Sequence, residues 1–294
     1  DRLHPKDKLD YVAELTKVLQ ETLDRGGNVV IPSFAVGRTQ EILYFLRKIK
    51  VGRLVKGHED FPVYVDSPMA VEATGIFQEN RWECFDDEAM EFVKEGINPI
   101  AFSGLKLSIT SEESKAINFD ETPKVIISAS GMCDAGRIRH HLKHNLWRPE
   151  CTILFVGYQS VGTLGRALVE GADEVKLFGE TIDVQAEICQ LTGLSGHADR
   201  EGLLAWVNAF SPKPKRVFVI HGEDEVENIF TQTLTEQGFT ACAPYNGEQW
   251  AIGAEGAVCL KEGTRTRIEH RVSEGAARAA TVFQRLLSAG KRLL

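Results

Sequence analysis

Five segments of the sequence share one design, in which a short run of apolar residues leads into a turn of small residues and then into the start of a helix. They lie at residues 29–38, 63–70, 126–132, 155–166 and 219–223. Strands that are each followed by a helix favour a doubly wound α/β fold, in which a mostly parallel sheet carries helices on both faces. In such a sheet, binding sites gather where the carboxyl ends of the strands meet the loops.

The alternation of strands and helices changes near residue 174. Residues 175–184 are typical of a hairpin, and helices alternate with short strands again between 199 and 242. A chain of 294 residues is long enough for two domains. We therefore expect one domain over residues 1–180 and a second over 181–294. A last helix is expected from about 273 to 293, packed on the second domain or forming a homodimer contact.

Composition and charge exclude several classes of protein, namely disordered chains, collagen and coiled coils. The chain is 43% hydrophobic and 26% charged, as in ordinary globular proteins, and it has no apolar run long enough to span a membrane. The 42 acidic and 34 basic residues give a net charge of −8, which argues against coating nucleic acid by bulk charge but leaves room for a local basic groove. The six cysteines form no C-x-x-C pair, so we expect free thiols in a reducing cytoplasm.

One local strip of the sequence, residues 137–148, is basic and contains no acidic residue. At 3.6 residues per turn, Arg137, His141, His144 and Arg148 share one face of a helix. The functional interpretation is a strip that faces a polyanion, and the alternative is an ordinary solvated helix face.

Two further arginines and two histidines lie in similar turns. Arg38 and Arg166 are close to expected helix starts, where a guanidinium can hold phosphate with two hydrogen bonds. His197 precedes a helix that Asp199 is well placed to cap, and His221 follows a predicted strand. Histidines at such positions suit metal ligation or proton transfer, although each taken alone is more often an ordinary loop residue.

The motifs gain meaning from their order along the chain. They are SFAVGR at 33–38, DSPMA at 66–70, SGM at 130–132 with GR at 136–137 and HHL at 140–142, GYQ at 157–159 with GTLGR at 162–166, SGHAD at 195–199 and HGE at 221–223. This order, over about residues 1–225, resembles the β-CASP family of metallo-β-lactamase-fold nucleases. The resemblance is closest to the RNA-processing branch, which includes ribonuclease J and the endonuclease subunit of the cleavage-and-polyadenylation machinery.

The resemblance implies both a layout and a set of site residues. A β-CASP sheet domain would cap a two-zinc site, and the second domain would be the C-terminal part of an αββα metallo-β-lactamase domain. His221 would be a zinc ligand and catalytic residue, and His197 would protonate the leaving oxygen or steady the scissile phosphate. The residues expected to bind RNA phosphates are Arg38, Ser130, Gly131, Arg137, His141 and Arg166.

One departure from the family pattern is serious. The main metal motif of the family, H-x-H-x-D-H, is absent, and in the family it precedes the segment that matches residues 1–4. Because a catalytic zinc normally takes three protein ligands, His221 alone cannot hold a zinc pair. We therefore expect the intact parent to hydrolyse single-stranded RNA by a zinc-bound hydroxide, and this chain to be an inactive part of it.

Two alternatives remain open. One is a non-catalytic RNA-binding or scaffold homologue of the same fold. The other is a nucleotide-binding doubly wound domain, which is weaker because neither G-x-G-x-x-G nor G-x-x-x-x-G-K-[ST] occurs in the sequence.

Overall fold

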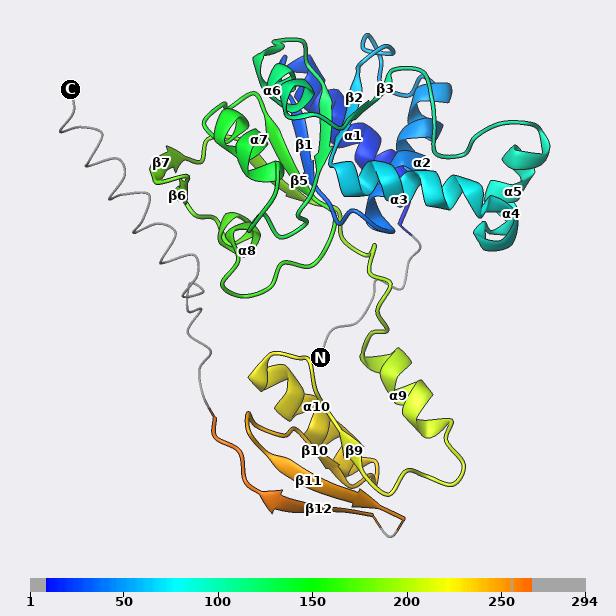
Figure 1. Ribbon diagram of the computed structural model, residues 1–294, viewed down its shortest axis with the longest axis vertical. Helices are drawn as coiled ribbons and strands as arrows, with labels where there is room; N and C mark the ends of the chain where they lie inside the picture. The colour runs from blue at the N-terminus through cyan, green and yellow to red at the C-terminus, as the bar shows by residue number, and fades with distance from the viewer. Residues whose placement is uncertain (1–8, 255, 266–294) are drawn as a thin grey trace, which may run out of the picture. The chain divides into compact units, whose positions relative to one another are not determined.

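The computed structural model describes residues 9–254 and 256–265 of the chain (Figure 1). Contacts along the chain divide it into two compact units between Gly196 and His197. Each unit is described by itself below.

The larger unit is built on a six-stranded sheet with the strand order β3-β2-β4-β1-β5-β8. Every pairing in this sheet is parallel. Its strands are β1 (Val29–Pro32), β2 (Val63–Asp66), β3 (Leu105–Ser108), β4 (Val125–Ser128), β5 (Thr152–Phe155) and β8 (Glu187–Gln190). The predicted α/β fold with a mostly parallel sheet is confirmed.

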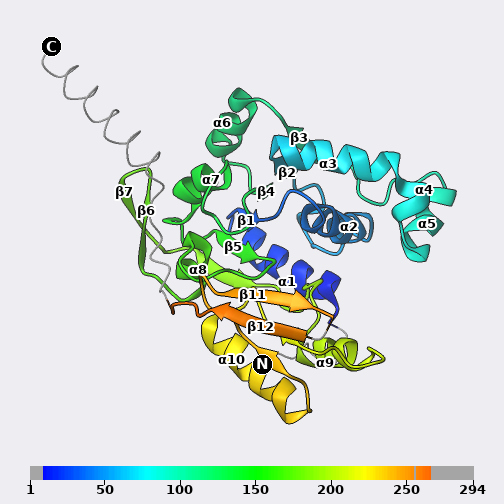
Figure 2. The same ribbon diagram turned by 60° about the horizontal axis from the view of Figure 1, so that its bottom comes forward.

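Helices cover both faces of this sheet, as Figure 2 shows. The helices of this unit are α1 (Tyr11–Asp24), α2 (Arg38–Val51), α3 (Pro68–Glu79), α4 (Arg81–Cys84), α5 (Asp87–Lys94), α6 (Ser111–Phe119), α7 (Ile138–Asn145) and α8 (Leu164–Val169), of which α4 and α5 lie beyond the end of α3, away from the sheet. Alternate strand residues point to opposite faces. Val29 and Ile31 therefore pack with α1 and α2 in one core cluster, whereas Val30 packs with α7 and α8 in another.

The predicted hairpin is present, but the sheet continues beyond it. β6 (Glu174–Leu177) pairs with β7 (Glu180–Asp183) in antiparallel fashion. The chain then returns to the large sheet as its edge strand β8, which follows the hairpin along the chain. The division of the chain into domains at residue 180 stays a prediction.

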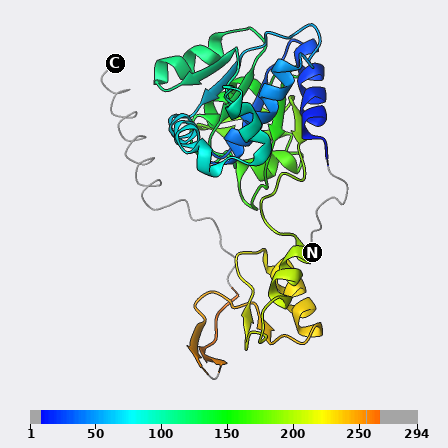
Figure 3. The ribbon, with the colours of Figure 1, turned by 90° about the vertical axis from the view of Figure 1, so that its right-hand side faces the viewer.

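The smaller unit follows Gly196 along the chain (Figure 3). Its elements are α9 (Arg200–Asn208), β9 (Val217–Phe218), α10 (Asp224–Glu236), β10 (Ala241–Cys242), β11 (Gln249–Gly253) and β12 (Gly256–Lys261). Asp199 caps α9 as expected, accepting a hydrogen bond from the Gly202 amide at 2.8 Å. Among the described residues of this unit, Val207, Leu234 and Phe239 are the buried members of its hydrophobic cluster. The helix expected from 273 to 293 lies outside the described residues.

Two expectations about the chain as a whole can be compared with the structure. All six cysteines are free thiols, so no disulfide framework exists among them. Within the described part of the chain, we find no helix with the length and apolar character that a membrane crossing requires.

Candidate functional site

A buried polar network surrounds Asp66, at the carboxyl end of β2. Asp66 Oδ1 accepts a hydrogen bond from Arg137 Nη1 at 2.7 Å, and Oδ2 accepts one from Ser114 Oγ at 2.6 Å. The same Oδ2 lies 2.6 Å from His141 Nε2, and both side chains have no exposed surface. On its other side, His141 Nδ1 lies 2.8 Å from the side-chain oxygen of Asn118. The network therefore joins β2, α6 and α7.

The partners of Asp66 decide its charge. Burial by itself raises the pKa of this carboxyl group, but hydrogen bonds from His141 and Ser114 and the charge of His141 outweigh burial and lower it to about 2. Asp66 is therefore ionised at neutral pH. Its charge balances the guanidinium of Arg137, whose Nη2 also donates to the Ile109 carbonyl at 2.6 Å.

The network corrects one expectation from the sequence. The helix face that holds Arg137 and His141 is turned toward the sheet instead of toward a polyanion, because Asp66 receives both side chains. His144, on the same face, packs against Phe119, and Arg148 pairs with Glu150 at 2.8 Å. His141 has no surface with which to touch RNA, so a contribution from it to RNA binding would be indirect.

Ser130 and Gly131 lie in a tight turn between β4 and α7. The Ser130 amide donates to the Ala135 carbonyl at 3.0 Å, and Gln159 Nε2 donates to the Gly131 carbonyl at 2.9 Å. Gly136 closes the turn with φ +83°, and a Cβ at this position would lie 2.4 Å from the Ala129 carbonyl oxygen. The turn therefore requires glycine at 136 for both its backbone angle and its space.

Arg38 follows β1 and Arg166 follows β5, and both of these strands lie on the same side of β4 in the sheet. Arg38 donates to Glu41 and to the Leu194 carbonyl. Arg166 Nε donates to Glu170 at 2.6 Å. Since β4, β1 and β5 are neighbours and parallel, the segments that carry the predicted phosphate contacts all leave the same edge of the sheet. The structure gives both arginines protein partners, and their contact with phosphate stays a prediction.

The two candidate histidines belong to the smaller unit. His197 and His221 are both exposed, and His221 has φ +70°, in the turn before α10. Gly222 donates its amide to Glu227 at 2.7 Å and so holds this turn. Across residues 9–254 and 256–265, no group of three or more His, Cys, Asp or Glu side chains could hold a metal ion. The residues described do not fit a zinc site by themselves, and we derive no metal-dependent step from them.

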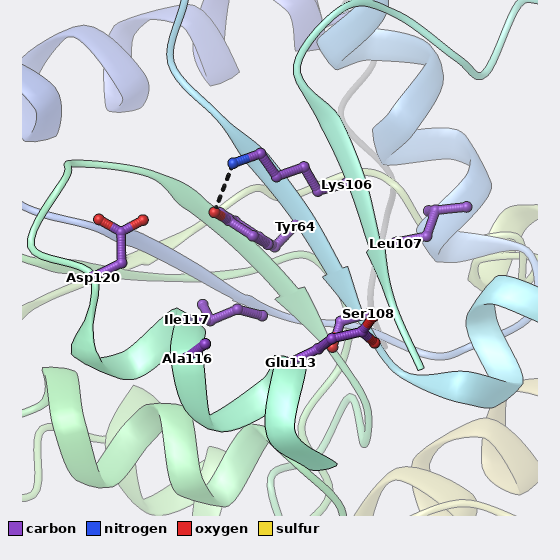
Figure 4. A pocket seen from close by; sticks show the side chains of 8 residues that line it. All are labelled: Tyr64, Lys106, Leu107, Ser108, Glu113, Ala116, Ile117 and Asp120. Carbon is purple, nitrogen blue, oxygen red and sulfur yellow. Dashed lines mark hydrogen bonds between the residues drawn. The ribbon is translucent and has the colours of Figure 1, made fainter. Parts of the chain in front are cut away.

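A cavity of about 340 Å³ opens beside the edge strand β3 (Figure 4), and none of the predicted site residues lines it. Lys106 and Glu113, two of its polar side chains, have hydrogen-bond partners. Lys106 Nζ donates to the Tyr64 hydroxyl at 3.0 Å, and Glu113 accepts from the Thr110 amide at 2.9 Å as part of a capping box. The lining residues are Tyr64, Lys106, Leu107, Ser108, Glu113, Ala116, Ile117 and Asp120.

Asp66 begins the DSPMA motif, but it is not among the site residues predicted from the sequence. A signal for it exists in the sequence, because an acidic residue directly after a buried strand needs partners when it is desolvated. Ser67 and Pro68, which follow it, start α3 through a side-chain cap and a favourable first-turn proline. These neighbours account for the turn but not for the carboxylate.

Two protein-family models match successive parts of the chain. The family model described as the Beta-Casp domain matches residues 39–168. A second model, described as the Zn-dependent metallo-hydrolase RNA specificity domain, matches residues 181–244. The first match covers the helices and strands from α2 to α8, and the second begins within the hairpin of β6 and β7.

Curated relatives align with about three quarters of the chain. Ribonuclease TTHA0252 of Thermus thermophilus is 38% identical over 227 residues, which are 76% of this chain and 50% of the relative. The RNase J-like protein of Methanocaldococcus jannaschii is 32% identical over 75% of this chain and 49% of its own length. Transcription termination factor FttA of the same organism is 36% identical over 75% and 35%. The chain spans half or less of these relatives, and it belongs to the β-CASP family.

Proposed function

We propose that this chain is the RNA-binding part of a zinc-dependent ribonuclease and that it binds single-stranded RNA. The observation that carries the proposal is the succession, along one chain, of a Beta-Casp domain and an RNA specificity domain of Zn-dependent metallo-hydrolases. Relatives named as a ribonuclease and an RNase J-like protein support the same activity.

The edge of the sheet beyond β4, β1 and β5 is the proposed place of the RNA backbone. Helix starts offer amide groups and a positive dipole end to phosphate. Arg38 and Arg166 would exchange Glu41 and Glu170 for phosphate oxygens, a low-cost exchange because both carboxylates are partly exposed. Arg137 and His141 would support this edge by holding Asp66.

The smaller unit would contribute to hydrolysis only together with further ligands. We assign His221 as one zinc ligand, and His197 as the group that protonates the leaving oxygen or steadies the phosphate. Zinc would supply the activated water of the reaction. Because the described residues do not form a zinc site, this chain alone is expected to bind RNA without cutting it.

The experiment uses the purified chain with zinc and an end-labelled single-stranded RNA of mixed sequence. Binding is followed by fluorescence anisotropy and cleavage on a denaturing gel. We expect a complex whose affinity falls with salt, since phosphate contacts release counterions, and we expect the RNA to remain intact. Cleavage that a chelator abolishes would contradict the inactivity of the chain. Absence of any complex would overturn the RNA-binding role itself.

A further inference from the structure

The outward face of α7 carries residues that the proposed function does not use. Three large aromatic rings are exposed around it. Phe119 ends α6 and is 76% exposed, Trp147 follows α7 and is 54% exposed, and Phe178, between β6 and β7, is 46% exposed. A group of exposed rings on one surface is typical of an interaction site.

Two of these rings pack against histidine and arginine side chains of α7. The His140 ring stacks on Phe178 with the centroids 4.4 Å apart, and the guanidinium of Arg139 lies 5.0 Å from the centre of the same ring. One turn further along the same face, His144 meets the edge of Phe119, with the ring centroids 6.0 Å apart. The rings are therefore held in place while much of their surface stays open.

The backbone of Phe178 gives a second, independent observation. Phe178 has φ +54° and Gly179 has φ +84°, so both central residues of the β6–β7 turn are left-handed. Turns of this kind favour Asn-Gly, and a bulky side chain with positive φ is an outlier that costs free energy. Such residues gather at functional sites. A ring has been placed where the turn itself would prefer asparagine.

This face of α7 carries two cationic side chains that could contact the phosphates of a nucleic acid. Residues 138–147 include Arg139 and Lys143 and no acidic residue. Lys143 pairs with Glu180 at 2.7 Å, in a pair whose carboxylate is 61% exposed. Burial and the neighbouring charges of His141 and Arg139 lower the pKa of His140, and burial with the charge of His141 lowers that of His144. At neutral pH both imidazoles are therefore flat, uncharged rings.

We propose that this face binds single-stranded RNA, with its rings stacking on unpaired bases and its two cations contacting phosphates. We call it the α7 platform, and it consists of Phe119, Arg139, His140, Lys143, Trp147 and Phe178. The inference rests on the proposed function, since it adds a second contact for the same RNA. Rings separated by cations match the alternation of bases and phosphates. An apolar protein segment would offer no anionic group to Arg139 and Lys143.

The test measures the affinity of the full chain for a fluorescent 12-nucleotide RNA, in EDTA so that no cleavage can occur. The double variant Phe119→Ala/Trp147→Ala removes two rings, and Phe178→Asn removes the third while giving the turn its preferred residue. We expect each to weaken binding by about 5- to 30-fold. Phe178→Asn should keep or raise the melting temperature, because it relieves the left-handed phenylalanine. The matched control is Trp82→Ala, which removes a ring on α4 that is 61% exposed.

The possible outcomes test the α7 platform and the proposed function separately. Weaker binding by the platform variants, with unchanged binding by Trp82→Ala, supports the platform. A duplex RNA bound as tightly as the single strand would overturn stacking. Platform variants that bind like the wild type overturn the platform while the proposed function stands. If the wild-type chain binds no RNA, the proposed function fails, and the platform fails with it.

Discussion

At the scale of a single residue, Asp66 holds together the hydrogen-bond network at the carboxyl end of β2. Its carboxylate has no exposed surface, and both of its oxygens have partners on α6 or α7. Its backbone carbonyl also accepts from Ser128 Oγ at 2.8 Å. Burying a carboxylate without such partners would destabilise the fold. Removing the carboxylate would likewise leave the charge of its partner uncompensated and destabilise the fold.

We expect Asp66→Asn to lower the free energy of unfolding by about 3–5 kcal/mol at pH 7, because Arg137 is left without its counter-charge. The stabilisation by the carboxylate is complete above its usual pKa of 3.8 and is lost as the pH falls toward the native value of about 2. Urea unfolding at pH 7, 5 and 3 should therefore show the gap between wild type and variant narrowing below pH 5.

The control for this substitution is Glu180→Gln, which removes the exposed partner of Lys143. It should change stability by less than about 1 kcal/mol, since exposed ion pairs contribute little. A gap for Asp66→Asn that stays constant from pH 7 to pH 3 would show that the charge of Asp66 does not stabilise the fold.

At the scale of elements, the turn between β4 and α7 depends on one glycine. Gly136 and Gly171 have nearly the same backbone angle, with φ +83° and +87°. They differ in space, because a Cβ at 171 meets nothing within 4 Å whereas one at 136 collides with the Ala129 backbone.

We expect Gly171→Ala to cost about 1 kcal/mol of unfolding free energy, from its left-handed backbone alone. Gly136→Ala should cost roughly 2–4 kcal/mol, because the turn must also shift. Chemical denaturation of both variants provides the measurement. Equal losses would mean that the turn has room to move and does not constrain Ser130 and Gly131.

At the scale of the whole molecule, each compact unit has a core of its own. The larger unit has two extensive clusters, and the smaller one has Val207, Leu234 and Phe239. Within the part of the smaller unit that the structure describes, few side chains are buried in a common cluster.

Leu234→Ala should therefore destabilise the smaller unit by about 2–5 kcal/mol through loss of a fully buried side chain. Amide hydrogen exchange read residue by residue should show faster exchange in α10, with the protection of β1 and β4 unchanged. Leu204→Ala, at a partly buried position of the same cluster, should have a smaller effect. An equal loss of protection in β1 would show that the two units unfold together.

The sequence predicted those elements whose apolar pattern is strong and local. The segment at 63–70 contains β2 and the start of α3, and the hairpin at 175–184 contains β6 and β7. It missed β3 and β8, the edge strands, because their burial patterns are mixed and their sequences include charged residues. Edge strands are half solvated, so they lack the continuous apolar run by which central parallel strands are recognised.

The sequence by itself determined the α/β class, the order of the motifs and the family, because these depend on short-range periodicity and on residue identity. Only the tertiary structure decided which face of α7 is buried. His141 meets Asp66 across 75 residues of sequence, whereas helical periodicity compares positions only three or four apart. A basic helix face has the same sequence pattern whether it contacts RNA or a buried carboxylate. Here the neighbouring strand β2 supplies the carboxylate of Asp66, so the face is buried.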